Sequence, residues 1–140
     1  MSSIARKMDE AEIEHFKEEL EVQRERLRNS LRRAEAEQRD LDTDRPPELG
    51  DFCAQTATRE YFFERISLQR RLLHRIEIAL QRIQAGTFGE CIACGEAVSR
   101  KRLQVMPWTE YCLRCQEERE RRTTAPQPNA YYFGGTQRVA

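Results

Sequence analysis

The sequence lacks the features on which most enzymes and membrane proteins depend. It has no run of about 18 apolar residues, so it offers no candidate membrane-spanning helix. Its two histidines, His15 and His74, both fall in stretches with a helical pattern, where a lone histidine is usually solvated or part of a packing seam. No Ser/His/Asp set accompanies them. We therefore expect neither enzymatic activity nor a membrane location.

Net charge and apolar content are also low. The 24 basic and 24 acidic residues cancel, so the charge of the whole chain does not indicate a nucleic-acid partner, and we expect no direct sequence-specific DNA binding. Hydrophobic residues make up 39% and charged residues 34% of the 140 positions, a ratio typical of long solvated helices. Residues 1–8 contain no apolar stretch like that of a signal peptide. We expect a cytoplasmic protein whose residues 1–8 pack on its globular part.

Glycine and proline are missing between Asp9 and Leu41, where good helix formers dominate. Apolar residues recur every seventh position there, with a gap at Gln23 and Arg24. This pattern predicts one long helix with a narrow coiled-coil seam. The members of the repeat are Ile13, Leu20, Leu27, Ala34 and Leu41.

A second helix of the same kind follows a break at residues 43–54, which contain Pro46, Pro47 and Gly50. It is expected to begin near Cys53 to Ala57 and to run to about Gln84. Residues 9–45 carry 13 acidic and 8 basic residues, whereas residues 57–86 carry 6 Arg and 3 Glu. Opposite charges and a short loop predict an antiparallel hairpin over residues 9–86 within a monomer. The seam of the second helix is Phe62, Ile66, Gln69, Leu73, Ile76, Leu80 and Ile83.

Four cysteines form two Cys-x-x-Cys pairs, Cys91 with Cys94 and Cys112 with Cys115, separated by 17 residues. Each pair can aim two sulfurs at one point, and the longer connection lets the chain double back. This arrangement predicts one tetrahedral zinc ion, and because four thiolates leave no position for water, the zinc would be structural. The alternatives are two disulfides or four unrelated buried thiols.

The remaining segments complete the predicted fold. Gly86 lies where a helix-ending glycine would lie, and Thr109 is expected to cap a helix that carries the second cysteine pair and runs to about Arg122. Residues 87–122 form the zinc module, and residues 123–140 a flexible tail. The tail contains Tyr131-Tyr132-Phe133, which is either an accidental aromatic cluster or a docking segment. The predicted fold class is mostly α: a long antiparallel coiled-coil hairpin attached to a small globular C4 zinc-finger module with a C-terminal helix.

The zinc region resembles the DksA/TraR family of bacterial transcription regulators. Residues 87–96, Thr-Phe-Gly-Glu-Cys-Ile-Ala-Cys-Gly-Glu, are similar to the family pattern F-G-x-C-x-x-C-G, and the spacing between the cysteine pairs is that of DksA. With the preceding coiled coil, the resemblance covers about residues 5–122. It implies direct binding to RNA polymerase, with the coiled coil in the secondary channel and its tip near the catalytic centre.

The resemblance also implies which tip residues act. The family tip motif is D-x-x-D-x-A, and ungapped alignment from Cys91 places Glu48 at the first Asp, Asp51 at the second and Cys53 at the Ala, followed by Ala54. Asp51, which keeps the family residue, is the first candidate for contact with the polymerase active site. Cys53 is interpreted as a passive small residue.

Some members of the family respond to guanosine tetraphosphate, bound by basic residues at the base of the rod. Arg75 keeps a positive charge at one such position and is the candidate alarmone contact. Met106 and Gln116 stand where an Arg and a Lys are found. Loss of two of three cations should weaken phosphate binding, so we expect weak or absent potentiation by the alarmone.

Three alternatives stay open at this stage. Arg100-Lys101-Arg102 between the cysteine pairs would suit a zinc-dependent nucleic-acid-binding protein. The acidic pair Glu48 and Asp51 could recruit a second magnesium ion for transcript cleavage, as in the Gre factors. The helical seams could also pair between chains in a dimeric scaffold.

Overall fold

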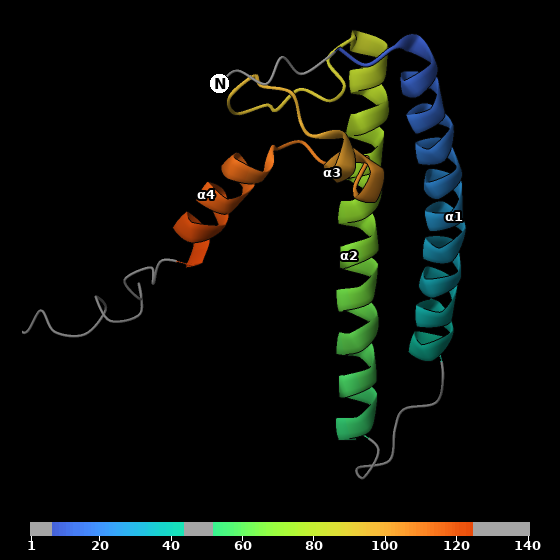
Figure 1. Cartoon of the computed structure of the whole chain (residues 1–140). Helices are drawn as coiled ribbons and strands as arrows, with labels where there is room; N and C mark the ends of the chain where they lie inside the picture. The colour runs from blue at the N-terminus through green and yellow to red at the C-terminus, as the bar shows by residue number, and fades with distance from the viewer. Residues whose placement is uncertain (1–6, 44–51, 125–140) are drawn as a thin grey trace, which may run out of the picture.

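The computed structural model describes residues 7–43 and 52–124, which form a long helical hairpin with a small module at its base (Figure 1). The four helices are α1 (Glu10–Thr43), α2 (Phe52–Ala85), α3 (Arg100–Val105) and α4 (Leu113–Thr124). Outside helices, the described residues make one isolated antiparallel bridge, between Glu90 and Ala97. The predicted mostly helical fold with a coiled-coil hairpin is confirmed. None of the helices in the described ranges combines the length and apolar content needed to cross a membrane.

Local hydrogen bonds define where the hairpin helices begin and end. At the start of α1, the Glu12 amide donates to the Asp9 carboxylate at 2.8 Å, and the Asp9 amide donates to the Glu12 carboxylate at 3.0 Å, a reciprocal capping box. At the end of α2, Gly86 adopts a positive φ of 75°. Its amide donates to the Ile83 carbonyl and the Thr87 amide to the Arg82 carbonyl, which is the Schellman pattern. Gly86 therefore ends the helix where the sequence predicts.

The two long helices lie side by side and antiparallel, and their apolar contacts are densest at the base. Phe16 and Leu20 of α1 and Ile76 and Leu80 of α2 are buried there. Farther along, Ala34 and Ile66 are buried, but Phe52 and Tyr61 are 64% and 60% exposed. The apolar core of the hairpin is therefore concentrated at its base, and the side chains between the two helices become more exposed to solvent toward the tip.

A polar layer interrupts the seam in the middle of the rod. Gln69 donates to the Ser30 hydroxyl at 3.0 Å, while the Gln69 carbonyl oxygen and the Arg24 Nε are buried without a hydrogen-bond partner among the described residues. The gap at Arg24 in the heptad pattern is thus a gap in apolar packing. A polar pair in such a seam favours one register over its neighbours.

Ion pairs cross the rod in both charge directions. Arg70 of α2 contacts Glu35 of α1 at 2.5 Å, but Arg28 of α1 contacts Glu77 of α2 at 3.0 Å. The opposite net charges of the two helices are therefore only part of their complementarity. Both pairs are at least partly exposed, so each contributes about 1 kcal/mol or less.

The module differs from the sequence prediction in two respects. Ser99 caps an unpredicted short helix, α3, by accepting a bond from the Arg102 amide at 3.3 Å. The prediction that Thr109 caps the last helix is wrong, because α4 begins at Leu113 and the buried Thr109 hydroxyl instead donates to the Tyr111 carbonyl. Cys112 consequently precedes α4, and Cys115 lies in its first turn.

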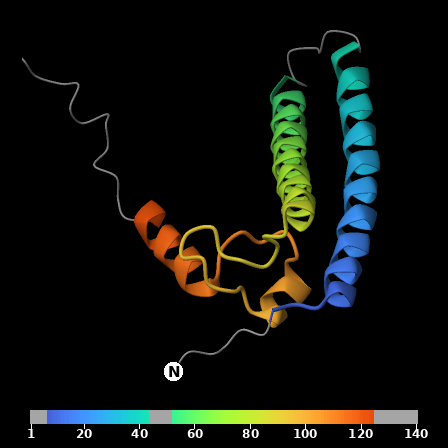
Figure 2. The ribbon, with the colours of Figure 1, turned by 90° about the horizontal axis from the view of Figure 1, so that it is seen from above.

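The module and the rod share one hydrophobic core at the base, where Figure 2 shows α3 beside the start of α1. The Phe16 and Phe88 rings lie 5.6 Å apart, and Glu12 pairs with Arg100 at 2.5 Å. The Arg82 guanidinium on the last turn of α2 donates to the carbonyls of Thr87 and Glu90. These contacts fix the direction in which the rod leaves the module.

The importance of the base core can be tested at Leu20, whose side chain is completely buried. Leu20→Ala leaves a cavity where rod and module meet, so the free energy of unfolding should fall by about 3 kcal/mol. The matched control is Val22→Ala, because Val22 is 50% exposed on the same helix, and this change should cost no more than about 0.5 kcal/mol. Urea unfolding followed by circular dichroism measures both. Equal losses in the two variants would contradict a core centred at the base.

Candidate metal centre, rod tip and basal pocket

The four cysteine sulfurs converge at one point in the module. The Sγ atoms of Cys91, Cys94, Cys112 and Cys115 all lie within 4.8 Å of one another, and no disulfide links them. The turn after Cys91 positions the first pair, because Gly95 takes a φ of 75° and its amide donates to the Cys91 carbonyl at 2.9 Å. The second pair reaches the same point through a bond from the Ile92 amide to the Glu110 carbonyl at 3.0 Å.

The cluster has the dimensions of a tetrahedral zinc site. A Zn–S distance of about 2.3 Å places neighbouring sulfurs of a tetrahedron about 3.8 Å apart. The Cys94 and Cys112 Sγ atoms are 3.8 Å apart. Four sulfurs complete a tetrahedral zinc site, and the metal-binding group found among the described residues contains no further donor, so the ion that these residues would hold is structural rather than catalytic.

The acid–base properties of the thiols also call for a cation. Burial raises the pKa of Cys91, but backbone N–H groups, led by that of Cys112, outweigh burial and lower this pKa to about 6. A hydrogen bond with Cys112, and then burial, raise the pKa of Cys115 to about 12. Four sulfurs this close cannot all be thiolates unless positive charge balances them. A divalent ion that favours sulfur supplies that charge.

One further charge lies at the rim of the cluster. The carboxylate of Glu96, and then the sulfur of Cys94, raise the pKa of Arg114, whose guanidinium lies 3.4 Å from Glu96. Arg114 is therefore a permanent cation beside a sulfur-rich anionic site. The Cys-x-x-Cys pattern contains Arg114 but gives no sign of this contact, which depends on how the two pairs meet.

The structure describes half of the predicted tip. Glu48 and Asp51 lie outside the described residues. Cys53 and Ala54 are exposed in the first turn of α2, which begins at Phe52, one residue before the predicted range of Cys53 to Ala57. Cys53 is a free thiol far from the cysteine cluster along the chain. An exposed pair at the distal end of α2 is available to a partner.

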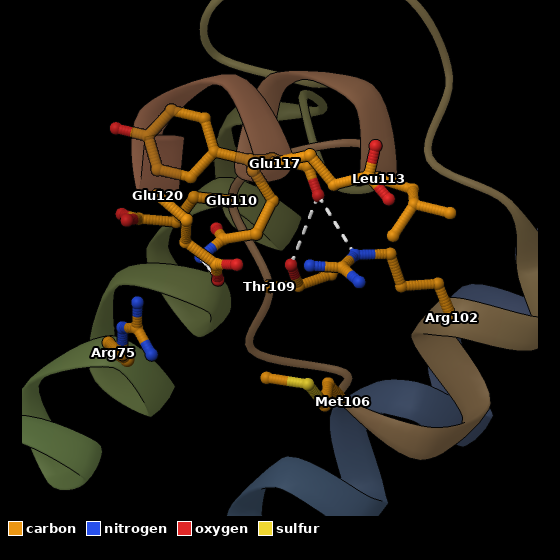
Figure 3. A pocket seen from close by; sticks show the side chains of 10 residues that line it. Arg75, Arg102, Met106, Thr109, Glu110, Leu113, Glu117 and Glu120 are labelled. Carbon is orange, nitrogen blue, oxygen red and sulfur yellow. Dashed lines mark hydrogen bonds between the residues drawn. The ribbon is translucent and has the colours of Figure 1, made fainter. Parts of the chain in front are cut away.

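Arg75, Met106 and Gln116 come together in a cavity of about 300 Å³ between α2, the module and α4 (Figure 3). Sequence alignment indicates these three positions for phosphate binding, but it misses the rest of the lining. Two cations, Arg75 and Arg102, and three carboxylates line the cavity. The carboxylates belong to Glu110, Glu117 and Glu120. Glu110 precedes α4, and the spacing of Glu117 and Glu120 would indicate a shared helix face only once the start of α4 is known.

Hydrogen bonds engage part of this lining. The Arg102 Nε donates to the Tyr111 carbonyl at 3.1 Å (Figure 3). The side-chain amide Nε2 of Gln116 donates to the Glu120 carboxylate at 2.8 Å. Arg102 is thus partly committed to the backbone of the module. This cavity, which we name the basal cavity, is lined by three acidic and two basic side chains.

Removal of metal gives a direct test of the cysteine cluster. The purified chain should contain one zinc ion, and a chelator strong enough to remove it should lower the thermal midpoint, because the metal supplies most of the folding energy of so small a module. Cys91→Ser should abolish stoichiometric zinc, measured by elemental analysis. Cys53→Ser is the matched control and should retain it. Full zinc in Cys91→Ser, or an unchanged midpoint after chelation, would contradict the assignment.

Comparisons with known proteins agree with this architecture. The model of the prokaryotic dksA/traR C4-type zinc finger matches residues 86–121. An uncharacterized protein from Aquifex aeolicus is 34% identical over 104 residues, which are 74% of this chain and 72% of that protein. The RNA polymerase-binding transcription factor DksA of Salmonella typhimurium is 30% identical over 108 residues, 77% of this chain and 71% of that protein.

A solved structure is similar over most of its length. The transcription factor DksA2 from Pseudomonas aeruginosa superimposes with a TM-score of 0.72 and 30% identity, covering 82% of this chain and 88% of that one. The superposition therefore shows a shared fold of hairpin and module. The C4 zinc site predicted from sequence is confirmed by the family model together with the four converging sulfurs. From its sequence and its architecture, this chain belongs to the DksA/TraR family of C4-type zinc-finger proteins.

Proposed function

We propose that this protein binds RNA polymerase in the cytoplasm, inserts its hairpin into the secondary channel and modulates transcription initiation. The observation that carries the proposal is that most of the helical hairpin of this DksA-family chain projects beyond the zinc module. Helices of 34 residues reach about 51 Å from end to end, and in the part of the chain that the structure describes the core shared with the zinc module lies at their base. A relative that is 30% identical is named as an RNA polymerase-binding transcription factor.

The structure favours this proposal over direct nucleic-acid binding by the module. Of the three consecutive basic residues, Arg100 pairs with Glu12, and Arg102 donates to the Tyr111 carbonyl. Contact with a phosphate backbone would require these side chains to give up partners within the protein. Lys101 alone would supply too little positive charge for binding at physiological salt.

Asp51 carries the proposed effect on the polymerase. Its carboxylate would accept hydrogen bonds near the catalytic centre or alter the surroundings of the active-site magnesium. Glu48, Cys53 and Ala54 would contact the same region. The rod and its base would thus bind the polymerase, and the tip would change its activity.

We also propose that guanosine tetraphosphate has little influence on this protein. The basal cavity brings Arg75 together with Met106 and Gln116, which cannot supply positive charge, and with the three Glu side chains. A polyphosphate would meet net repulsion there, and Arg102 already donates to a carbonyl. Repulsion between like charges in a partly enclosed site outweighs a single remaining cation.

The role of the tip is tested by Asp51→Asn, which keeps the shape of the side chain and removes its charge. Affinity for RNA polymerase should stay within about threefold, whereas the effect on initiation at a responsive promoter should fall by about tenfold, since a charge-assisted hydrogen bond is worth on the order of 1.5–3 kcal/mol. Glu60→Gln removes an exposed acid farther down α2 and is the matched control. Normal regulation by Asp51→Asn would refute the role of the tip.

Alarmone dependence is tested by in vitro transcription with and without guanosine tetraphosphate. The wild-type protein should show less than about a twofold change. The double variant Met106→Arg/Gln116→Lys places two cations in the basal cavity and should gain a clear response, because each added ion pair with a phosphate contributes on the order of 1 kcal/mol or more. A strong response of the wild-type protein would contradict the proposal, as would a double variant that stays unresponsive.

A further inference from the structure

A second line of residues runs along α2 beside its packing seam. Tyr61, Leu68, Leu72 and Arg75 follow one another at steps of seven, four and three, so they share one face of the helix. We name these four residues the side stripe. Each lies one position before a seam residue, and the stripe therefore faces sideways from the contact with α1.

The side stripe continues an interface that the protein already forms. Toward the base, Ala79 on the same face is buried in the shared core, and Arg75 lines the cavity beneath α4. Leu72 is half-buried against the core. Beyond it, Leu68 is 55% exposed and Tyr61 is 60% exposed. Burial on this face therefore decreases from Ala79 toward the tip, and Leu68 and Tyr61 are left in solvent.

The last helix leaves the cavity on the side of the rod that carries the stripe. Both ribbon views place α2 between α1 and α4, and in Figure 1 α4 runs obliquely, toward the tip and away from α2. Gln116, Glu117 and Glu120 of α4 line the same cavity as Arg75. Glu120 lines the cavity with Arg75 one turn before α4 ends at Thr124, and these four residues add about 6 Å along α4.

The segment after α4 has the composition needed to cover such a surface. It contains Tyr131-Tyr132-Phe133 within 16 otherwise small or polar residues, with Arg138 as its one charged side chain. The seven steps from Thr124 to Tyr131 span at most about 24 Å. The distance along α2 from Arg75 to Leu68 is about 10 Å, and to Tyr61 about 21 Å. Even with the further 6 Å between Glu120 and Thr124, the aromatic trio has the length to reach Leu68, in the exposed half of the stripe.

The chemistry of the stripe suits aromatic side chains. Large aromatic rings gain the most from covering exposed Leu and Tyr. Arg65 lies between Tyr61 and Leu68 on the same face and is exposed, so its guanidinium can stack on a ring. The module already uses this pairing, with the Arg119 Cζ lying 4.3 Å from the centre of the Tyr111 ring.

We propose that the C-terminal segment of the same chain, through Tyr131-Tyr132-Phe133, docks on the side stripe of α2. The docked segment extends the cover of the module toward the tip and shields this face of the rod. This docking does not depend on the proposed function.

Photocrosslinking of the full-length zinc-loaded protein tests the proposal. With p-benzoyl-phenylalanine at position 132, crosslinks mapped by mass spectrometry should fall on residues 61–72 of the same chain. A mixture of isotope-labelled and unlabelled chains distinguishes crosslinks within a chain from crosslinks between chains. Leu68→Glu should reduce the yield by about fivefold, because it removes an apolar contact from the centre of the stripe.

Val22→Glu is the matched control, because Val22 is an equally exposed apolar residue on α1, outside the stripe. It should leave the yield unchanged, and circular dichroism confirms that both variants keep their helices. Crosslinks between chains would overturn the proposal in favour of a second copy as the occupant. Crosslinks elsewhere, no crosslinks, or an equal loss in both variants would overturn it as well.

Discussion

The convergence of four cysteine sulfurs at the base of the hairpin is the constraint on which the structure depends. The module has few buried apolar side chains of its own, chiefly Phe88, Val98 and Leu103, and these pack against the rod rather than around a separate centre. A bound zinc ion contributes on the order of 10 kcal/mol to the folding of so small a unit. Because Cys91 is buried within the shared core, the metal also holds the module against the rod.

A gradient of stability along the rod follows from this arrangement. The base combines buried Leu20 and Ile76 with the anchored module, whereas the middle contains the Ser30–Gln69 polar layer and the start of α2 is exposed. Elements with few buried contacts open most easily. The end that would meet a partner is therefore the least constrained part of the described hairpin, and the end that carries the metal is the most constrained.

Long-period patterns in the sequence predict most of this architecture. The heptads, the glycine at position 86 and the paired cysteines fix the hairpin and the metal site, because each depends on spacing along the chain. Sequence patterns do not predict the features that depend on contacts between distant parts of the chain. The six residues of α3 are too few to give a periodic signal. Thr109 resembles a helix cap in the sequence, but its hydroxyl donates to the Tyr111 carbonyl. The acidic lining of the basal cavity could not be predicted either, because it requires α2 and α4 to meet.

The central claim is that a metal-anchored rod delivers its acidic tip into RNA polymerase. A photocrosslinker at position 51, in a complex of the zinc-loaded protein with the polymerase, tests it most directly. The account predicts crosslinks to the active-centre region of the large polymerase subunits, which disappear when zinc is removed. Crosslinks confined to the outer surface of the polymerase, or equally strong crosslinks after zinc removal, would contradict it.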